Sequence, residues 1–392
     1  MPNAVNGLRE RLCSGTQKYA LLVGNGFNKH QFDYNGRHKP DDCDWGELLK
    51  HLVATDKIAN FLRQRPDACK KVKRIFELDN IHPSERGRFL FECLEESGFS
   101  RVNTIRALKE YLESEFTITK KSEFRQCELL DMIWENGHHI LTTNFDANIE
   151  NYFRELLQEK TKPCRIDALT EKPGQRKGGK RGKEQQDDEL SLLSGKTEIF
   201  WRMNKFRWEN FSGIQNAATW NDLSKDIWHV HGSVLKSSFT SVLFSSEDYF
   251  NAISHFRTMR GNILKDNWHG TRTWLKLFLD CPLIIVGIGL DEGELLLRHL
   301  LQIRRRYRWL QGNVEECPSY FLYVDSEAEA ACRSVLRKAG LPQGPDPCNT
   351  YLKLMGFHCL RFDTYQDMYN LQSHSSVAIG RPAGESPEGM CP

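Results

Sequence analysis

The sequence predicts an α/β fold in which a doubly wound, Rossmann-like parallel sheet carries a helical insertion after its first strand. Three observations support this prediction. Short apolar runs recur along the chain, these runs end in glycine or small polar residues, and most of them lead into a helical pattern. That order is typical of parallel strands joined by right-handed helical crossovers. With 392 residues, the chain is long enough to bury a sizeable core.

Five apolar runs and one final candidate near the C-terminus are the expected strands. In chain order they are Tyr19–Val23, His139–Thr142, Asp226–His231, Ile284–Val286, Tyr320–Val324 and the final candidate His358–Phe362. The fourth lies in the apolar stretch Pro282–Leu290, which is only about half as long as a membrane span. We therefore interpret this stretch as a buried strand. Helices are expected to begin near Ala147 and to cover Glu292–Arg306 and Glu327–Ala339.

Residues 1–372 are expected to form a single α/β domain with two interruptions. The first is a helical insertion over about 44–136, where apolar residues such as Trp45, Leu48 and Leu52 recur at helical spacing. The second is a basic loop over about 159–196, rich in lysine, arginine, glycine and proline, which we expect to be flexible. Residues 373–392 are mostly small and polar, so we expect a disordered tail.

Composition narrows the class of protein. Hydrophobic residues make up 39% and charged residues 27% of the chain, which is typical of a soluble globular protein and not of a membrane protein. The net charge of +2 argues against a surface built mainly for nucleic acid, and only the basic loop remains a candidate for such contact. No two of the twelve cysteines lie within four residues of each other, and the N-terminus has no secretory signal pattern. We expect a cytoplasmic protein without a structural zinc module.

Glycine turns follow two of the expected strands. The first contains Gly24, Asn25, Gly26, Phe27 and Asn28, and the second contains Gly287 and Gly289. Glycine lets backbone amides approach a diphosphate closely, so these turns are candidate cofactor-binding residues. The alternative is that the glycines only satisfy the backbone geometry of tight turns.

The turn after the second strand combines a hydroxyl, an amide and a carboxylate in Thr143, Asn144 and Asp146. Here the alternative to a ligand site is a helix cap at Asp146 braced by Asn144. The third strand carries His229 and His231 at i and i+2. A metal site is one interpretation of this pair, but we expect one buried structural histidine and one exposed histidine, with His231 as the better candidate base.

Two acidic residues follow later strands. Asp291 comes directly after the second glycine turn, and Asp325 directly after the fifth expected strand. Each is interpreted either as an acceptor of hydrogen bonds from ribose hydroxyls or as an acidic residue that stabilises the N-terminus of a helix.

Taken in order, these turns resemble the sirtuin superfamily. Gly24-Asn25-Gly26 stands where sirtuins have Gly-Ala-Gly, and Thr143-Asn144-Phe145-Asp146 is similar to their Gln-Asn-Ile-Asp turn. His231-Gly232 matches the His-Gly pair, and Gly287-Ile288-Gly289 corresponds to the later Gly-Thr-Ser turn. Sirtuin deacylases carry a four-cysteine zinc module after the His-Gly pair, whereas residues 232–280 contain no cysteine here. In this respect the chain resembles divergent sirtuin-like proteins of bacterial antiphage defence.

The resemblance implies an NAD+ glycohydrolase that releases ADP-ribose and nicotinamide and depletes NAD in abortive infection. It implies that Asn144 positions the attacking water and the ribose, that Asp146 fixes the nicotinamide end, and that His231 is the general base. The alternatives are an NAD-dependent protein deacylase and a non-catalytic module that senses NAD or ADP-ribose. The implied partners are further copies of the chain and a regulator such as a HerA-type ATPase or an Argonaute protein, with no membrane contact.

Overall fold

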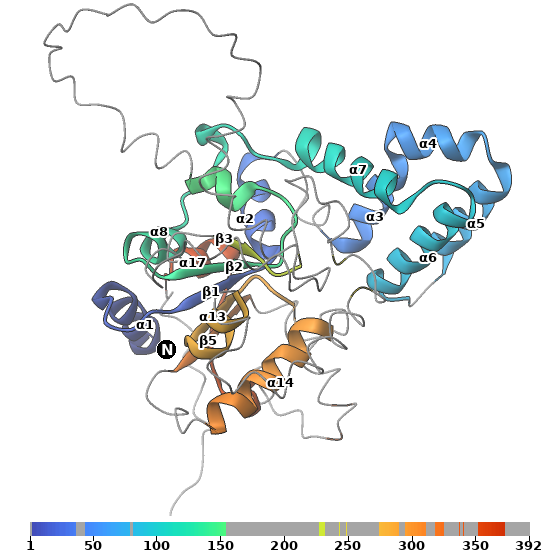
Figure 1. Ribbon diagram of the computed structural model, residues 1–392. Helices are drawn as coiled ribbons and strands as arrows, with labels where there is room; N and C mark the ends of the chain where they lie inside the picture. The colour runs from blue at the N-terminus through green and yellow to red at the C-terminus, as the bar shows by residue number, and fades with distance from the viewer. Residues whose placement is uncertain are drawn as a thin grey trace, which may run out of the picture.

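The strands in the part of the chain that the structure describes form one parallel six-stranded sheet with the order β3-β2-β1-β4-β5-β6 (Figure 1). The computed structural model describes residues 2–36, 44–78, 81–153, 227–231, 243, 248, 274–289, 295–310, 318–324, 337, 340 and 352–372. Every neighbouring pair of strands is parallel. The strand order is that of the Rossmann fold, so the predicted fold class is confirmed.

Fully buried strands form the centre of the sheet. β1 (Ala20–Val23), β2 (His139–Thr142) and β4 (Leu283–Val286) are buried at every position, as strands covered on both faces are. Their register is level, because Val23 lies opposite both Thr142 and Val286. The carboxyl ends of these strands therefore meet at one edge of the sheet.

The outer strands extend the sheet on both sides of this centre. β3 (Ile227–His229) pairs with β2, while β5 (Ser319–Val324) pairs with β4 and with β6 (Phe357–Phe362). β6 alternates between buried and exposed positions over part of its length, as expected for a strand at the edge of a sheet. All six strands overlap the runs predicted from the sequence.

Helices cover both faces of the sheet. One face packs against α13 (Trp274–Asp280) and α14 (Leu295–Leu310). The other face packs against α1 (Pro2–Ser14), α8 (Glu128–Glu135), the helical residues 148–153 and α17 (Tyr365–Tyr369). Helix α2 (Gly26–Asn35) follows β1 directly and contributes Phe27 to this second core.

The helical insertion has a hydrophobic core of its own. It contains α3 (Trp45–Ala54), α4 (Asp56–Arg63), α5 (Pro66–Glu77), α6 (Pro83–Glu96), α7 (Arg101–Tyr111), the π-helical turn Leu112–Phe116 and the short 3-10 helix Lys121–Glu123. The core of α3 to α7 also includes Phe32 of α2 and Phe145 of the turn after β2. Figure 1 shows α3 to α7 projecting to one side of the sheet. Phe32 and Phe145 thus join the insertion to the carboxyl edge of the sheet.

Some of the predicted segments lie outside the described residues. These are the basic loop over 159–196, the tail 373–392 and most of the expected helix Glu327–Ala339. The helix predicted over Glu292–Arg306 is observed as α14 from Leu295, with a C-terminal end at Leu310. Among the helices that are described, none combines the length and apolar composition that a membrane span requires.

Candidate active site

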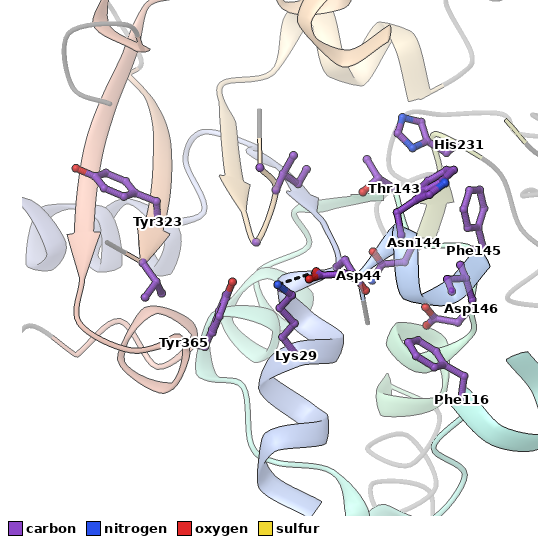
Figure 2. Close-up of a pocket in the computed structure, with 18 of the residues that line it drawn as sticks. Lys29, Asp44, Phe116, Thr143, Asn144, Phe145, Asp146, His231, Tyr323 and Tyr365 are labelled. Atoms are coloured by element: carbon purple, nitrogen blue, oxygen red, sulfur yellow. Dashed lines mark ion pairs between the residues drawn. The ribbon is translucent and has the colours of Figure 1, made fainter. Parts of the chain in front are cut away.

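A pocket lies at the carboxyl edge of the sheet, above the point where β1 and β4 run side by side. Turns after β1, β2, β3 and β4 line it, together with the end of β5, α17 and the start of the helical insertion (Figure 2). The strand order reverses between β1 and β4, and open α/β sheets bind their ligands at such reversal points. The cavity volume is about 250 Å³, and the cavity opens to solvent.

The two glycine turns pack directly against each other at the floor of this pocket. Gly24 N donates to Val286 O and Gly26 N donates to Gly287 O, both at 2.9 Å. A Cβ atom on Gly26 would lie 2.5 Å from the Cα of Gly287, and Gly287 itself has a positive φ of 64°. The contact therefore requires glycine on both sides. Gly26, Gly287 and Gly289 line the pocket with Asn25, while Gly24 serves the contact between the turns.

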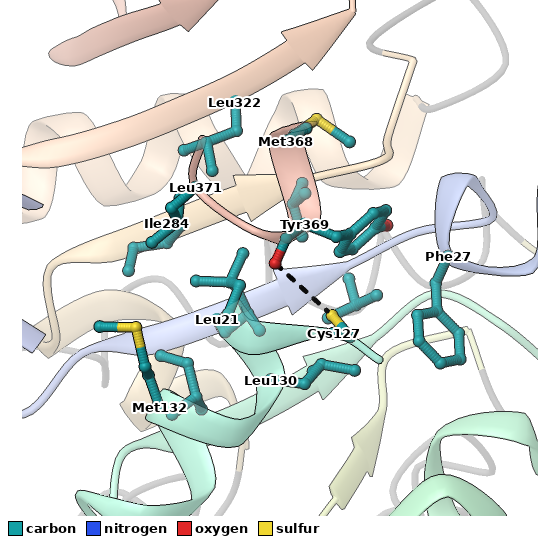
Figure 3. Packing of buried hydrophobic residues seen from close by; sticks show 14 of the residues in the cluster. Leu21, Phe27, Cys127, Leu130, Met132, Ile284, Leu322, Met368, Tyr369 and Leu371 are labelled. Carbon is teal, nitrogen blue, oxygen red and sulfur yellow. Dashed lines mark hydrogen bonds between the residues drawn. The ribbon is translucent and has the colours of Figure 1, made fainter. Parts of the chain in front are cut away.

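Phe27 and Asn28 lie beneath the pocket. The ring of Phe27 packs edge-on against Tyr152 and Tyr369. Phe27 and Tyr369 belong to the core between the sheet and α17 (Figure 3). Asn28 is buried, and its Nδ2 donates to Asp146 Oδ2 at 2.7 Å. Neither side chain lines the pocket; Asn28 supports Asp146, which does, and Phe27 fills the core beneath it.

The turn after β2 places Thr143, Asn144, Phe145 and Asp146 in the pocket wall. The backbone N–H of Asn144 donates to Thr142 Oγ1 at 3.1 Å. The side-chain Nδ2 of Asn144 is buried and has no hydrogen-bond partner within the described part of the chain. A buried amide that lines a pocket without a partner is available to bind a ligand.

Asp146 is both a helix cap and a pocket residue. Its Oδ1 accepts from the backbone N–H of Asn148, at the start of the helical residues 148–153, at 2.9 Å. Its Oδ2 accepts from Asn28. Burial raises the pKa of Asp146, and the two hydrogen bonds oppose that shift. The two interpretations of this residue from the sequence are therefore compatible.

The expectation that one histidine of β3 is buried and the other exposed is wrong, because His229 and His231 are each 1% exposed. His231 lines the pocket, and burial lowers its pKa to about 3, so its imidazole is neutral near pH 7. His229 binds Glu150, a carboxylate 79 residues away in the chain. Such a partner is not visible from local sequence. In the part of the chain that the structure describes, no group of three or more His, Cys, Asp and Glu side chains is arranged to hold a metal.

The catalytic residues predicted from the sequence lie around one pocket. Asn144, Asp146 and His231 line it together with the two glycine turns. The two other predicted residues, Asp291 and Asp325, lie outside the described residues.

A family model for the SIR2-like domain matches residues 138–341, just over half of the chain. The chain belongs to the SIR2-like family. No curated protein matches it. The matched region begins next to β2 and includes Asn144, Asp146, His231 and the second glycine turn, whereas the first glycine turn precedes it. SIR2-like domains use NAD as a substrate, so the pocket is the candidate NAD site.

The SIR2-like site contains a cation that the sequence analysis did not select. Lys29, one turn into α2, is 7% exposed and lines the pocket. Its Nζ lies 2.9 Å from Asp44 Oδ1 at the start of the insertion (Figure 2). Among the described lining residues Lys29 alone is a lysine or arginine. Its position three residues after Gly26 places it on the same helix face as that glycine, a spacing that could have identified it.

Apolar residues from the insertion form a further part of the pocket wall that sequence reasoning missed. Trp45, Leu48, Leu112 and Phe116 line the pocket, and Trp45 packs edge-on against Phe145. On the opposite side the wall is formed by Leu322, Tyr323, Val324, Tyr365 and Met368. Because these residues come from segments distant in the chain, no local pattern predicts their meeting.

Acid is expected to destabilise this SIR2-like domain through buried histidines. His30 of α2 stacks on Tyr369 with 4.9 Å between ring centroids, and burial, assisted by the nearby charge of Arg125, lowers its pKa to about 4. The unfolded chain binds a proton at His30 near its ordinary pKa of 6.5, and the folded chain does not. Stability from this group is therefore present above pH 6.5 and is lost as the pH falls towards 4.

His30→Phe, which keeps an aromatic ring on Tyr369, is expected to reduce this acid sensitivity. Between pH 7 and pH 5 the loss of unfolding free energy should be smaller than in the wild type by about 2 kcal/mol. Urea unfolding at both pH values measures the difference. Equal losses in the two proteins would exclude His30 as a source of the acid sensitivity.

Proposed function

We propose that this chain is an NAD+ glycohydrolase that cleaves the bond between nicotinamide and ribose and releases ADP-ribose. The observation that carries the proposal is the meeting of two packed glycine turns with a buried amide, carboxylate and imidazole in one pocket. Cleavage of an elongated dinucleotide needs both features, since the glycine turns would hold its diphosphate and the three polar side chains would act on its sugar.

In this proposal the diphosphate lies on the glycine turns. Gly26 is the first residue of α2, and the dipole of a helix places partial positive charge at its N-terminus, which favours anions. The ammonium group of Lys29 adds a full positive charge beside that terminus. The nicotinamide ribose then extends towards Asn144 and His231 on the far side of the turn after β2. Asp291 and Asp325 remain proposed acceptors for ribose hydroxyls.

The chemistry follows from the charge of the substrate. The C1′–N bond breaks with its electron pair moving to the nicotinamide ring, which becomes neutral, while positive charge develops on the ribose. The buried carboxylate of Asp146 favours this charge electrostatically. Asn144 holds the water and the ribose hydroxyls, and the neutral imidazole of His231 accepts the proton of that water as the new C–O bond forms.

Product analysis tests this proposal against its two rivals. The purified full-length chain is incubated with NAD, and nicotinamide and ADP-ribose are quantified by chromatography. The proposal predicts that nicotinamide and free ADP-ribose form in equal amounts when no acylated peptide is added. A requirement for acyl-lysine peptide would indicate a deacylase, whose cysteine zinc module has no counterpart in residues 232–280. Saturable NAD binding without any product would indicate a sensing module.

The biological role that we propose, by resemblance, is depletion of NAD in bacterial antiphage defence. A domain that consumes NAD must be held inactive until it is triggered, and we propose self-association or a regulator such as a HerA-type ATPase or an Argonaute protein for this control. Induced expression in bacteria, with and without phage, tests the role. A fall in cellular NAD only after infection supports it, and unchanged NAD contradicts it.

Replacing Lys29 with methionine is expected to weaken NAD binding more than catalysis. Methionine keeps the apolar stem of the side chain and removes the charge proposed to face the diphosphate. We expect KM for NAD to rise about tenfold, and kcat to change by less than about threefold. Initial rates measure both constants. Lys57→Met is the matched control, because Lys57 pairs with Glu110 on the exposed surface of the insertion. An unchanged KM in Lys29→Met would exclude the proposed diphosphate contact.

A further inference from the structure

A buried pair of ionisable side chains lies directly behind the turn that presents Asn144. His229 ends β3 and Glu150 lies among the helical residues 148–153, and their side chains are 1% and 11% exposed. The imidazole Nε2 of His229 contacts Glu150 Oε1, and its Nδ1 lies 2.7 Å from the backbone oxygen of Asn144. Both ring nitrogens therefore bind within the protein, and neither His229 nor Glu150 lines the pocket.

The contact with Asn144 determines where His229 carries a proton. A backbone carbonyl oxygen only accepts hydrogen bonds, so Nδ1 must be the donor. Nε2 then either donates to the Glu150 carboxylate or accepts from its protonated form, and in both cases Glu150 keeps the proton on Nδ1. Burial alone lowers the pKa of His229, but the charge and hydrogen bond of Glu150, with the Asn144 carbonyl, outweigh it and raise the pKa.

Stability alone does not explain the buried pair of His229 and Glu150. Buried ion pairs contribute little net stability, because removing two charges from water offsets their attraction. In addition, Glu150 Oε2 is buried and has no hydrogen-bond partner within the described ranges. An unsatisfied carboxylate oxygen of this kind costs free energy. The arrangement therefore points to a geometric requirement at the neighbouring turn.

We propose that Glu150 and His229 are positioning residues that hold the Asn144 turn in the geometry needed for NAD cleavage. This inference rests on the function proposed above. The Asn144 peptide is held from both sides, because Thr142 Oγ1 accepts its N–H and His229 donates to its carbonyl. The Thr142 hydroxyl in turn donates to Val23 O at the end of β1, at 2.9 Å. With its backbone fixed to β1 and β3, Asn144 directs its amide into the pocket.

Two substitutions at Glu150 distinguish its role in positioning His229 from the effect of its negative charge. Glu150→Leu removes the partner of His229 Nε2. Glu150→Gln keeps a donor to Nε2 and so leaves a neutral imidazole with its proton on Nδ1. We expect kcat of the full-length Glu150→Leu protein to fall about 10- to 100-fold, with the Kd for ADP-ribose within about threefold of the wild type. For Glu150→Gln we expect a kcat within about threefold of the wild type.

Hydrogen exchange of the same proteins gives a readout that does not depend on activity. Mass spectrometry should show faster deuterium uptake in peptides covering residues 142–147 of Glu150→Leu, and wild-type uptake in Glu150→Gln. Peptides covering β4 should be unchanged in both. If Glu150→Leu does not fold, Glu150→Asp replaces it, because its carboxylate is one methylene group shorter and is expected to lose the contact with Nε2.

The proposal is overturned by any of three results. These are wild-type kcat and exchange in Glu150→Leu, equal loss of kcat in Glu150→Gln and Glu150→Leu, or faster exchange throughout the sheet. If the wild-type chain does not cleave NAD, the proposed function fails, and the exchange data still show whether Glu150 holds the Asn144 turn.

Discussion

Replacing Asn144 with alanine is expected to lower NAD cleavage at least about a hundredfold, the size of effect seen when one preorganised transition-state donor is removed. The amide Nδ2 of Asn144 lies in the pocket wall without a partner among the described residues. Alanine removes the amide that is proposed to bind the attacking water and the ribose hydroxyls. Because Nδ2 has no hydrogen-bond partner among the described residues, the substitution should leave the melting temperature nearly unchanged. Nicotinamide release and thermal unfolding measure the two effects.

Asn151→Ala is the matched control for this prediction. Asn151 lies in the helical residues 148–153 that follow the Asn144 turn, and its Nδ2 donates to Ile118 O at 2.9 Å, away from the pocket. Its loss should lower stability and leave kcat close to the wild-type value. If Asn144→Ala retained more than half of the wild-type rate, Asn144 could not have the role proposed for it.

Replacing His231 with alanine is expected to lower kcat about 10²- to 10⁴-fold, the range typical of a lost general base. Burial holds the pKa of His231 at about 3, so the free enzyme presents a neutral acceptor at every pH from 5 to 8. Rate measurements on the variant at saturating NAD give the size of the loss. In the wild type, the profile of kcat/KM should show no inflection from His231 near pH 6.5.

His138 provides the control for a buried histidine with a structural role. Its Nδ1 accepts from the backbone N–H of Tyr19 at 3.2 Å, and its Nε2 lies 2.9 Å from Leu12 O. His138→Ala should therefore destabilise the protein without a comparable loss of kcat. A His231→Ala protein that turns over NAD at the wild-type rate would contradict the mechanism, as would a wild-type inflection near pH 6.5 that disappears in this variant.

The sheet could be predicted because each strand has a recognisable local pattern in the sequence. Runs such as Leu21–Val23 and Ile284–Val286 are aliphatic, are buried on both faces, and end at glycine. Since the carboxyl ends of parallel strands share one edge, it followed that the turns at Gly26, Asn144 and Gly287 would lie close together. The strand order and the level register that bring them into one pocket are supplied by the structure.

The supporting residues could not be predicted, because each acts through a partner far away in the chain. The first glycine turn suggested five ligand contacts, but Asn28 holds Asp146 and Phe27 fills the core. His229, at the end of β3, is buried with Glu150 as its partner, a carboxylate 79 residues away in the chain. Trp45 reaches the pocket only because the insertion folds over the carboxyl edge of the sheet. Local patterns identify the residues at strand ends, and tertiary packing decides which of them face a ligand.

A crystal structure of the Asn144→Ala protein with NAD tests the central claim most directly, because the slowed variant should retain uncleaved substrate. We predict one intact dinucleotide with its diphosphate between Gly26 and Gly287 and its nicotinamide ribose beside His231. A dinucleotide bound elsewhere on the protein, or one whose nicotinamide ribose lies away from His231, would contradict the proposed site and the reaction assigned to it.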